Sequence, residues 1–79
     1  MTDPENEVVD ARGTACPVPI IMLAKAARAH GPGATLTVLV TDVAARLDVP
    51  AWARMTGHRF LGEKETDGGA LALTVRLDS

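Results

Sequence analysis

Apolar residues alternate with polar ones along some stretches of the chain and recur with helical spacing along others. Residues 35–40 (Thr-Leu-Thr-Val-Leu-Val) are the clearest predicted strand, and the short apolar run at 7–10 predicts an earlier one. Two further strands are predicted at 58–66 and 70–77, joined by Asp67-Gly68-Gly69, which is typical of a hairpin turn. In the last strand every second residue is a large aliphatic one, so we expect one of its faces to be buried.

Two segments between these strands have the pattern of amphipathic helices. The first spans residues 16–30 and ends at Gly31-Pro32-Gly33. Its apolar residues recur at positions i, i+3, i+4 and i+7, namely Ile20, Leu23, Ala24 and Ala27. The second spans about 43–56, and we expect it in two pieces, the first capped by Asp42 and the second by Asp48.

The predicted order of elements is β-α-β-α-β-β. The economical packing is an α/β fold of two layers, a mixed four-stranded sheet with both helices on one face. Residues 1–6 are expected to form a disordered lead-in, and residues 7–79 a single domain. A chain of 79 residues buries only ~60–65% of the surface that its unfolded form exposes. We therefore expect no deep cavity for a large cofactor, and we expect any chemistry at the surface or at the end of an element.

Composition and charge narrow the classes of partner. The chain has 8 Lys and Arg against 10 Asp and Glu, a formal net charge of −2, and only 3% aromatic residues. Direct binding of nucleic acid is disfavoured, because it relies on clustered cations and on aromatic rings that stack on bases. The polar, acidic N-terminus is unlike a secretory signal, and no apolar run approaches the ~20 residues that cross a bilayer. With one cysteine and hence no internal disulfide, we expect a cytoplasmic protein with a free thiol and no membrane contact.

The segment Cys16-Pro17-Val18-Pro19 carries the most chemical information. Proline lacks a backbone N–H and suits the first turn of a helix, so two prolines place Cys16 at or next to the N-cap. There the sulfur would face the positive end of the helix dipole and the free N–H groups of Val18 and Ile20. Such a site lowers a thiol pKa from about 8.5 into the ~3.5–7.5 range. A lone cysteine can equally be a buried, inert hydrophobic residue, and the residues alone leave both interpretations open.

The stretch around this cysteine resembles a known family. Residues 9–19 (Val-Asp-Ala-Arg-Gly-Thr-Ala-Cys-Pro-Val-Pro) resemble the signature of the TusA/SirA-like sulfur-carrier family, an Asp-x-Arg-Gly-x-x-Cys-Pro-x-Pro segment between the first strand and the first helix. The similarity continues through Asp42, residues 48–52, Gly57-His58 and the closing hairpin, and so covers about residues 8–77. The resemblance implies the same β-α-β-α-β-β fold.

The resemblance also implies a function. It implies a sulfur carrier, or sulfurtransferase, that holds sulfane sulfur as a persulfide on Cys16. Its sulfur donor would be a cysteine desulfurase or a rhodanese. A downstream acceptor protein would receive the sulfur for tRNA thiolation, cofactor synthesis or sulfur oxidation. No cofactor and no metal are implied, and we expect a monomer.

The same resemblance assigns roles to the residues around the thiol. Besides Cys16 as the persulfide-bearing residue, the matching positions are Asp10, Arg12 and Gly13, which shape the loop, Pro17 and Pro19, which start the helix, and Asp42, which lies near the cysteine. The chain lacks the second acid and the proline that often follow Asp42 in the family, and it has Thr14 where a leucine is common. These departures leave open which partner docks and which pathway the protein serves.

Two other functions remain open from the sequence. One is a non-catalytic protein-interaction or regulatory domain on the same scaffold, which predicts that replacing Cys16 leaves function unharmed. The other is a thiol redox protein. That protein would have to form mixed disulfides with other molecules, because the chain has no resolving cysteine.

The remaining candidate residues favour structural roles. Cys16, His30 and His58 lack the spacing of metal-ligand pairs. We expect His30 to be a favourable charge at a helix C-terminus, His58 to be structural or to face a partner, and Trp52 to lie in the core. Three arginines could form a basic surface for a partner or could simply be solvated: Arg46, Arg54 and Arg59.

Overall fold

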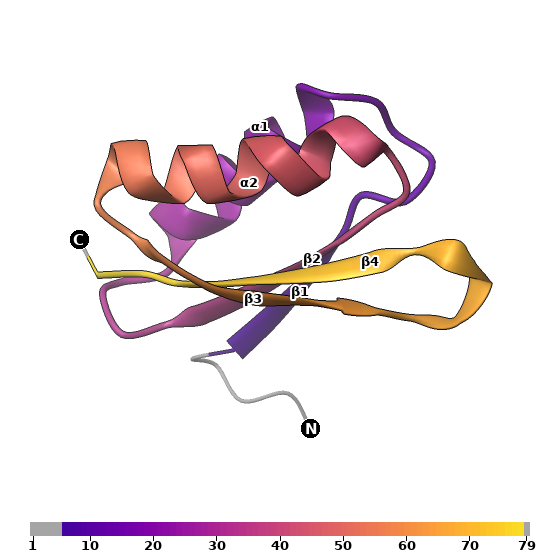
Figure 1. The fold of residues 1–79 in the computed structure, drawn as a ribbon. Coiled ribbons are helices and arrows are strands. Elements are labelled where there is room, and N and C mark those ends of the chain that lie inside the picture. Colours follow the sequence, from indigo (N-terminus) through magenta and orange to yellow (C-terminus); the bar gives the residue numbers. More distant parts are fainter. Residues whose placement is uncertain (1–5, 79) are drawn as a thin grey trace.

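The computed structural model describes residues 6–78, and Figure 1 shows them as two layers. The sheet consists of β1 (Asn6–Asp10), β2 (Thr35–Val40), β3 (Arg59–Glu65) and β4 (Leu71–Arg76). Both helices, α1 (Val18–Ala29) and α2 (Val43–Thr56), lie on one face of it, and a short 3₁₀ turn, η1 (Asp67–Gly69), joins β3 to β4. The predicted α/β fold, a mixed four-stranded sheet with two helices on one face, is confirmed.

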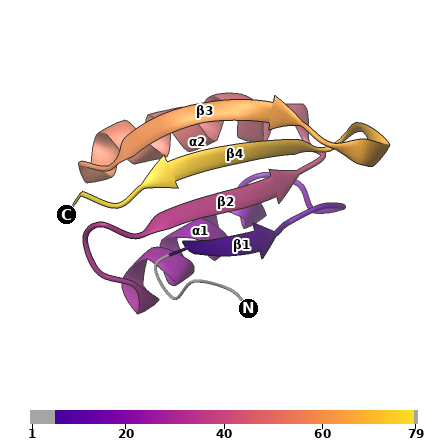
Figure 2. The same ribbon diagram turned by 90° about the horizontal axis from the view of Figure 1, so that it is seen from below.

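The order of the strands in the sheet is β1-β2-β4-β3 (Figure 2). Strands β1 and β2 are parallel, because α1 crosses over the sheet between them, whereas β4 is antiparallel to both β2 and β3. Between β3 and β4 the register shifts at Phe60 and Gly62, a bulge that the sequence did not predict. Since parallel strands end at the same edge, the chain leaves β1 and β2 side by side. The loop before α1 and the start of α2 therefore lie next to each other.

The core lies between the helices and the sheet. Its largest fully buried residues on the sheet side are Leu36, Val38, Val40, Leu73 and Val75 in the strands and Leu77 just after β4. On α2 the residues that face the core are Ala45, Val49 and Ala53. On α1 they are Pro19, Leu23 and Ala26, so the buried stripe differs from the predicted one, in which only Leu23 is fully buried. The ring of Pro19 packs into the core in the first turn and sets this orientation.

Helix α1 begins later than the sequence predicted. The backbone N–H of Val18 donates to the carbonyl of Ala15 at 2.9 Å, so a turn precedes the helix. Pro17 is the N-cap, and Cys16 therefore lies one residue before the cap. At the N-terminus, Asn6 belongs to β1 and not to the predicted lead-in, whereas residues 1–5 lie outside the described residues.

Helix α2 is one continuous helix, and the prediction of two pieces is wrong. Asp42 caps it by accepting the backbone N–H of Ala44 at 3.1 Å, whereas Asp48 lies within the helix and caps nothing. The helix passes through Pro50, which costs one backbone hydrogen bond. The buried face at positions i, i+4 and i+8 extends across the proline and holds both halves against the sheet.

Candidate functional site

The loop after β1 is anchored to the sheet at its start. The N–H of Ala11 donates to the carbonyl of Leu39 at 2.9 Å, and the Ala11 side chain is fully buried. Next to it, the guanidinium of Arg12 donates to both carboxylate oxygens of Asp10, at 2.8 and 2.7 Å. The side-chain hydrogen bond from Arg12, together with its backbone N–H, lowers the pKa of Asp10 to about 2. This pair is exposed, and it closes the first bend of the loop.

The start of α2 holds the rest of the loop. The N–H of Gly13 donates to Oγ1 of Thr41 at 2.9 Å, and Gly13 has a φ of +80°, which favours glycine. The N–H of Cys16 donates to Oδ2 of Asp42 at 2.8 Å. Because the other oxygen of Asp42 accepts the N–H of Ala44, one carboxylate both caps α2 and fixes the backbone of Cys16. These backbone hydrogen bonds lower the pKa of Asp42.

Cys16 therefore lies where the N-terminal ends of both helices meet. Its side chain is half-buried and packs against the edge of the core, and the peptide bond to Pro17 is cis. Pro17 itself is exposed, whereas Pro19 is buried in the core. Cys16 is the only cysteine of the chain, so its thiol is free of any internal disulfide.

The electrostatics at the sulfur are the opposite of what the sequence predicted. Burial, a hydrogen bond from the thiol to Asp48, and the negative charges of Asp48 and Asp42 raise the pKa of Cys16 to about 11. Of the two expected backbone donors, the N–H of Val18 is bonded to the carbonyl of Ala15, and the prolines on either side of Val18 have no N–H to add. The free protein thus holds a neutral thiol.

Asp48 is the site residue that sequence reasoning missed. It was expected to be a helix cap, and in the structure its carboxylate lies by the sulfur. No motif spacing links Cys16 to a residue in the second turn of α2. Only the pairing of the helix starts brings the two together, so the signal lies in the fold and not in a sequence pattern.

The solvent side of this region is largely aliphatic. Four large apolar side chains of the first two turns of the helices are exposed: Val18 (39%), Ile21 (60%), Val43 (76%) and Leu47 (75%). Val43 and Leu47 directly adjoin Asp42 and Asp48 in the sequence. Such a patch at the end of two helices can contact a partner protein.

The other candidate residues make structural contacts. Nε2 of His30, at the C-cap of α1, lies 2.8 Å from Oε1 of Glu7. His58 accepts the N–H of Asp78 on Nδ1, and its ring lies 5.2 Å from that of Trp52, which is half-buried against the core. Within residues 6–78, no group of three or more His, Cys, Asp and Glu side chains is arranged to hold a metal ion. No helix of that part of the chain is long and apolar enough to cross a membrane.

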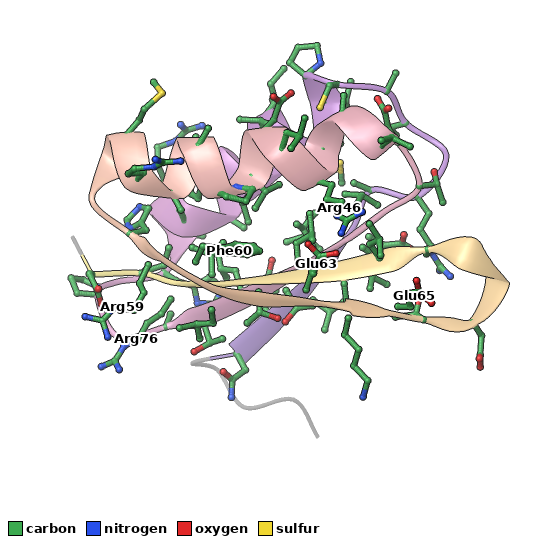
Figure 3. All side chains as sticks on the ribbon, in the orientation of Figure 1. Arg46, Arg59, Phe60, Glu63, Glu65 and Arg76 are labelled. Carbon is green, nitrogen blue, oxygen red and sulfur yellow. The ribbon has the colours of Figure 1, made fainter. Side chains whose placement is uncertain are left out.

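Two of the three arginines proposed as a basic surface are paired. Arg46 of α2 and Glu63 of β3 point toward each other, 2.9 Å apart (Figure 3). Arg59 lies 3.7 Å from Asp78. Arg54 forms no ion pair within the described residues. The three therefore do not form one patch of free cations.

Comparison with known proteins agrees with this geometry. A family described as Sulfurtransferase TusA matches residues 7–77, which is nearly the whole chain. The chain belongs to the TusA family. It is 37% identical over 68 residues to the sulfur carrier protein TusA of Pseudomonas paraeruginosa, with 86% of each chain covered. It is 39% identical to that of Pseudomonas entomophila, again over 86% of each chain.

A solved structure supports the same assignment. The crystal structure of a SirA-like protein from Desulfitobacterium hafniense matches with a TM-score of 0.82 and 30% identity, covering 92% of this chain and 99% of the other. The TusA-family membership shows a sulfur carrier that takes part in sulfur transfer. The roles of single residues in that transfer remain predictions.

Proposed function

We propose that this TusA-family carrier holds sulfane sulfur as a persulfide on Cys16. The observation that carries the proposal is the position of the only cysteine, half-buried at the meeting point of two helix starts and held there by Asp42. A thiol that is neither sealed in the core nor on a freely moving segment can be presented to another protein's reactive sulfur. The exposed aliphatic side chains around it supply contact area for that encounter.

The proposed transfer has two displacement steps. In the first, the Cys16 thiol loses its proton to water, and the thiolate attacks the outer sulfur of a donor cysteine persulfide. A new S–S bond forms at Cys16, the donor S–S bond breaks, and the donor cysteine leaves as a thiolate that takes up the proton. In the second step an acceptor thiolate attacks the outer sulfur held on Cys16, and Cys16 leaves as the thiolate. One sulfur atom is transferred from donor to acceptor without net oxidation of any protein, so no external oxidant is needed.

The high pKa of the free thiol makes docking part of this mechanism. While the carboxylates of Asp42 and Asp48 face water, they oppose formation of the thiolate. A donor that places cations against these carboxylates favours the thiolate, because opposite charge lowers the cost of ionising the sulfur. The carrier would then react with a docked donor and stay unreactive toward other oxidants and electrophiles.

The remaining motif residues would act on the shape of the loop. Asp10 and Arg12 close its first bend, Gly13 supplies the positive φ, and Asp42 fixes the Cys16 backbone. In this proposal Pro17 and Pro19 set where α1 begins, and residues 7–79 act as one domain. None of these residues touches the transferred sulfur directly.

We further propose a cysteine desulfurase or a rhodanese as the donor and a protein thiol as the acceptor. The acceptor would serve tRNA thiolation, cofactor synthesis or sulfur oxidation, in the cytoplasm, and the carrier would act as a monomer without binding nucleic acid itself. The acidic, aliphatic surroundings of the sulfur support a protein partner. A phosphate backbone is less well matched, because it binds to clustered cations.

The decisive experiment is to measure the intact mass after incubation with a cysteine desulfurase and free cysteine. The wild-type chain should gain the mass of one sulfur atom, and a reducing agent should remove it. Cys16→Ala should gain nothing while keeping the same circular dichroism spectrum. If wild type gains no sulfur from either a desulfurase or a rhodanese donor, the interaction or regulatory domain becomes the better account.

A further inference from the structure

A second surface lies at the opposite end of the helix layer from the thiol. A groove of about 440 Å³ runs between the C-terminal ends of α1 and α2. Its lining residues are Ala24, Ala27, Arg28, His30, Trp52, Thr56 and His58. Cys16 lies at the N-terminal ends of the same helices, and the 12 residues of α1 span ~18 Å. A molecule in this groove would therefore not cover the thiol.

The side chains of the groove offer hydrogen-bond donors. The guanidinium of Arg28 and the indole N–H of Trp52 have no partner within the described residues. His58 accepts the Asp78 N–H on Nδ1, at 3.3 Å, so its ring proton lies on Nε2, which makes it a third donor. The carboxylate of Glu7 lies 2.8 Å from Nε2 of His30 and is already engaged by it. A ligand that fits these groups must supply acceptors.

The backbone acceptors at the end of α2 are already occupied. The carbonyls of residues 52, 53 and 54 accept hydrogen bonds from the Thr56 hydroxyl and from the N–H groups of Gly57 and His58. The partial negative charge of this helix end is thereby partly offset. These three carbonyls are therefore not free to attract a cation into the groove.

Positive charge gathers at this end of a molecule whose net charge is −2. Arg54 lies beside the groove in a neighbouring hollow that also contains His58 and Arg59. Figure 3 shows Arg59 and Arg76 together at the same end of the sheet, where they are cross-strand neighbours. Asp78 is within 4 Å of both and neutralises only one of them. Arg28 and Arg54 keep their charge without an ion pair in residues 6–78.

We propose that this groove binds an acidic segment of a partner protein. Carboxylates of the segment would accept from Arg28 and His58, and an apolar side chain between them would lie against Trp52. The charge is too modest, and too mixed with Asp78 and Glu7, for the long run of phosphates in a nucleic acid. A segment with a few carboxylates and an apolar side chain matches the two donors and the ring of Trp52. A carrier that visits a donor and an acceptor could use this contact to stay bound while its thiol reacts at the other end.

Trp52 makes the proposal easy to test, because it is the only tryptophan and the chain has no tyrosine. Titration of the full chain with short poly-L-glutamate should change Trp52 fluorescence in a saturable way, and added salt should weaken the binding. Arg28→Gln should weaken it by about twofold to fivefold, the effect of losing one exposed ion pair. Lys64→Gln, the same change in charge on β3, should bind like wild type. Cys16→Ala should also bind like wild type, which separates this proposal from sulfur transfer.

Backbone amide chemical shifts locate the binding independently of fluorescence. In the same titration the amides of Arg28, Gly57 and His58 should move most, and that of Cys16 should not move. Absence of saturable binding, equal weakening by Lys64→Gln, or shifts confined to other residues would overturn the proposal. Tighter binding of a single-stranded RNA homopolymer through Arg28 would assign the groove to nucleic acid and likewise overturn it.

Discussion

The sulfur of Cys16 lies beside two carboxylates, and the closer interaction is with Asp48. Asp48→Asn removes a hydrogen-bond acceptor and a negative charge while keeping the size of the side chain. We therefore expect the pKa of Cys16 to fall from about 11 toward its ordinary value of 9.0, with burial and Asp42 retaining part of the shift. Below the pKa, each unit of fall raises the thiolate fraction about tenfold. The rate of alkylation by iodoacetamide as a function of pH measures this directly.

Asp67→Asn is a matched control for that experiment. Asp67 is an exposed acid in the turn between β3 and β4, and it contributes nothing to the ionisation of the sulfur. Its alkylation profile should follow wild type. An Asp48→Asn profile that also follows wild type would show that the carboxylate does not act on the thiol.

A second residue-scale prediction concerns Asp10. Arg12→Gln should return the pKa of Asp10 from about 2 toward 3.8, because the side-chain hydrogen bond from Arg12 is the main cause of the shift. The folded pKa is the lower one, so the pairing stabilises the fold above pH 3.8 and its contribution is lost as the pH falls through about 2. The carboxyl ¹³C shift of Asp10 gives the titration midpoint. Arg46→Gln, which removes a guanidinium bound to Glu63, should leave that midpoint unchanged.

At the scale of elements, the start of α2 is the feature on which the site depends. Asp42→Ala removes the N-cap of the helix and the acceptor of the Cys16 N–H together. We expect a fall in Tm of about 4–8 °C, the shift that loss of one cap causes in a domain of this size. The alkylation rate of Cys16 should rise at the same time, because the loop loses its anchor and the sulfur loses a neighbouring charge.

Asp48→Ala tests which of the two acids caps the helix. A helix in two pieces would lose its main cap with Asp48. The continuous helix 43–56 instead has that residue in its second turn, where truncation should move the Tm by less than about 4 °C. A larger fall for Asp48→Ala than for Asp42→Ala would contradict the structure of α2. Circular dichroism during heating provides both values.

These elements also show what a sequence can predict. The bounds of β2 at Thr35–Val40 and of α2 at Val43–Thr56 follow from local spacing and capping, and both match the structure. The predicted start of α1 does not match the structure, because the turn closed by Val18 and Ala15 depends on where the loop is anchored. The predicted direction of the Cys16 pKa shift was wrong for the same kind of reason. Burial is the largest cause of the raised pKa, and the carboxylate of Asp48, which only the packing of the two helix starts brings near, adds to it.

At the scale of the whole molecule, the helix layer has two chemically different ends. The N-terminal ends of α1 and α2 carry the thiol, acidic groups and exposed aliphatic side chains. The C-terminal ends carry the groove with Arg28, Trp52 and His58. Both helices run in the same direction over the sheet (Figure 1). A partner that lies along the helix layer can therefore contact the thiol end and the groove end at the same time. The alternation of strand residues predicted the sheet, but nothing in the sequence pattern joined Arg28 to His58 across the helices.

The whole layer rests on a small core, so its integrity should control the exposure of the thiol. Leu73→Ala empties a fully buried site at the centre of β4 and should cost about 2–5 kcal/mol. A chain of 79 residues has about 4–12 kcal/mol in total. Leu61→Ala removes the same atoms from a side chain that is 51% exposed and should cost less than about 1 kcal/mol. Urea unfolding gives both values. Since unfolding removes the carboxylates from the sulfur, alkylation of Cys16 should accelerate in Leu73→Ala and not in Leu61→Ala. Equal acceleration in both variants would show that the reactivity of the thiol does not depend on the stability of the core.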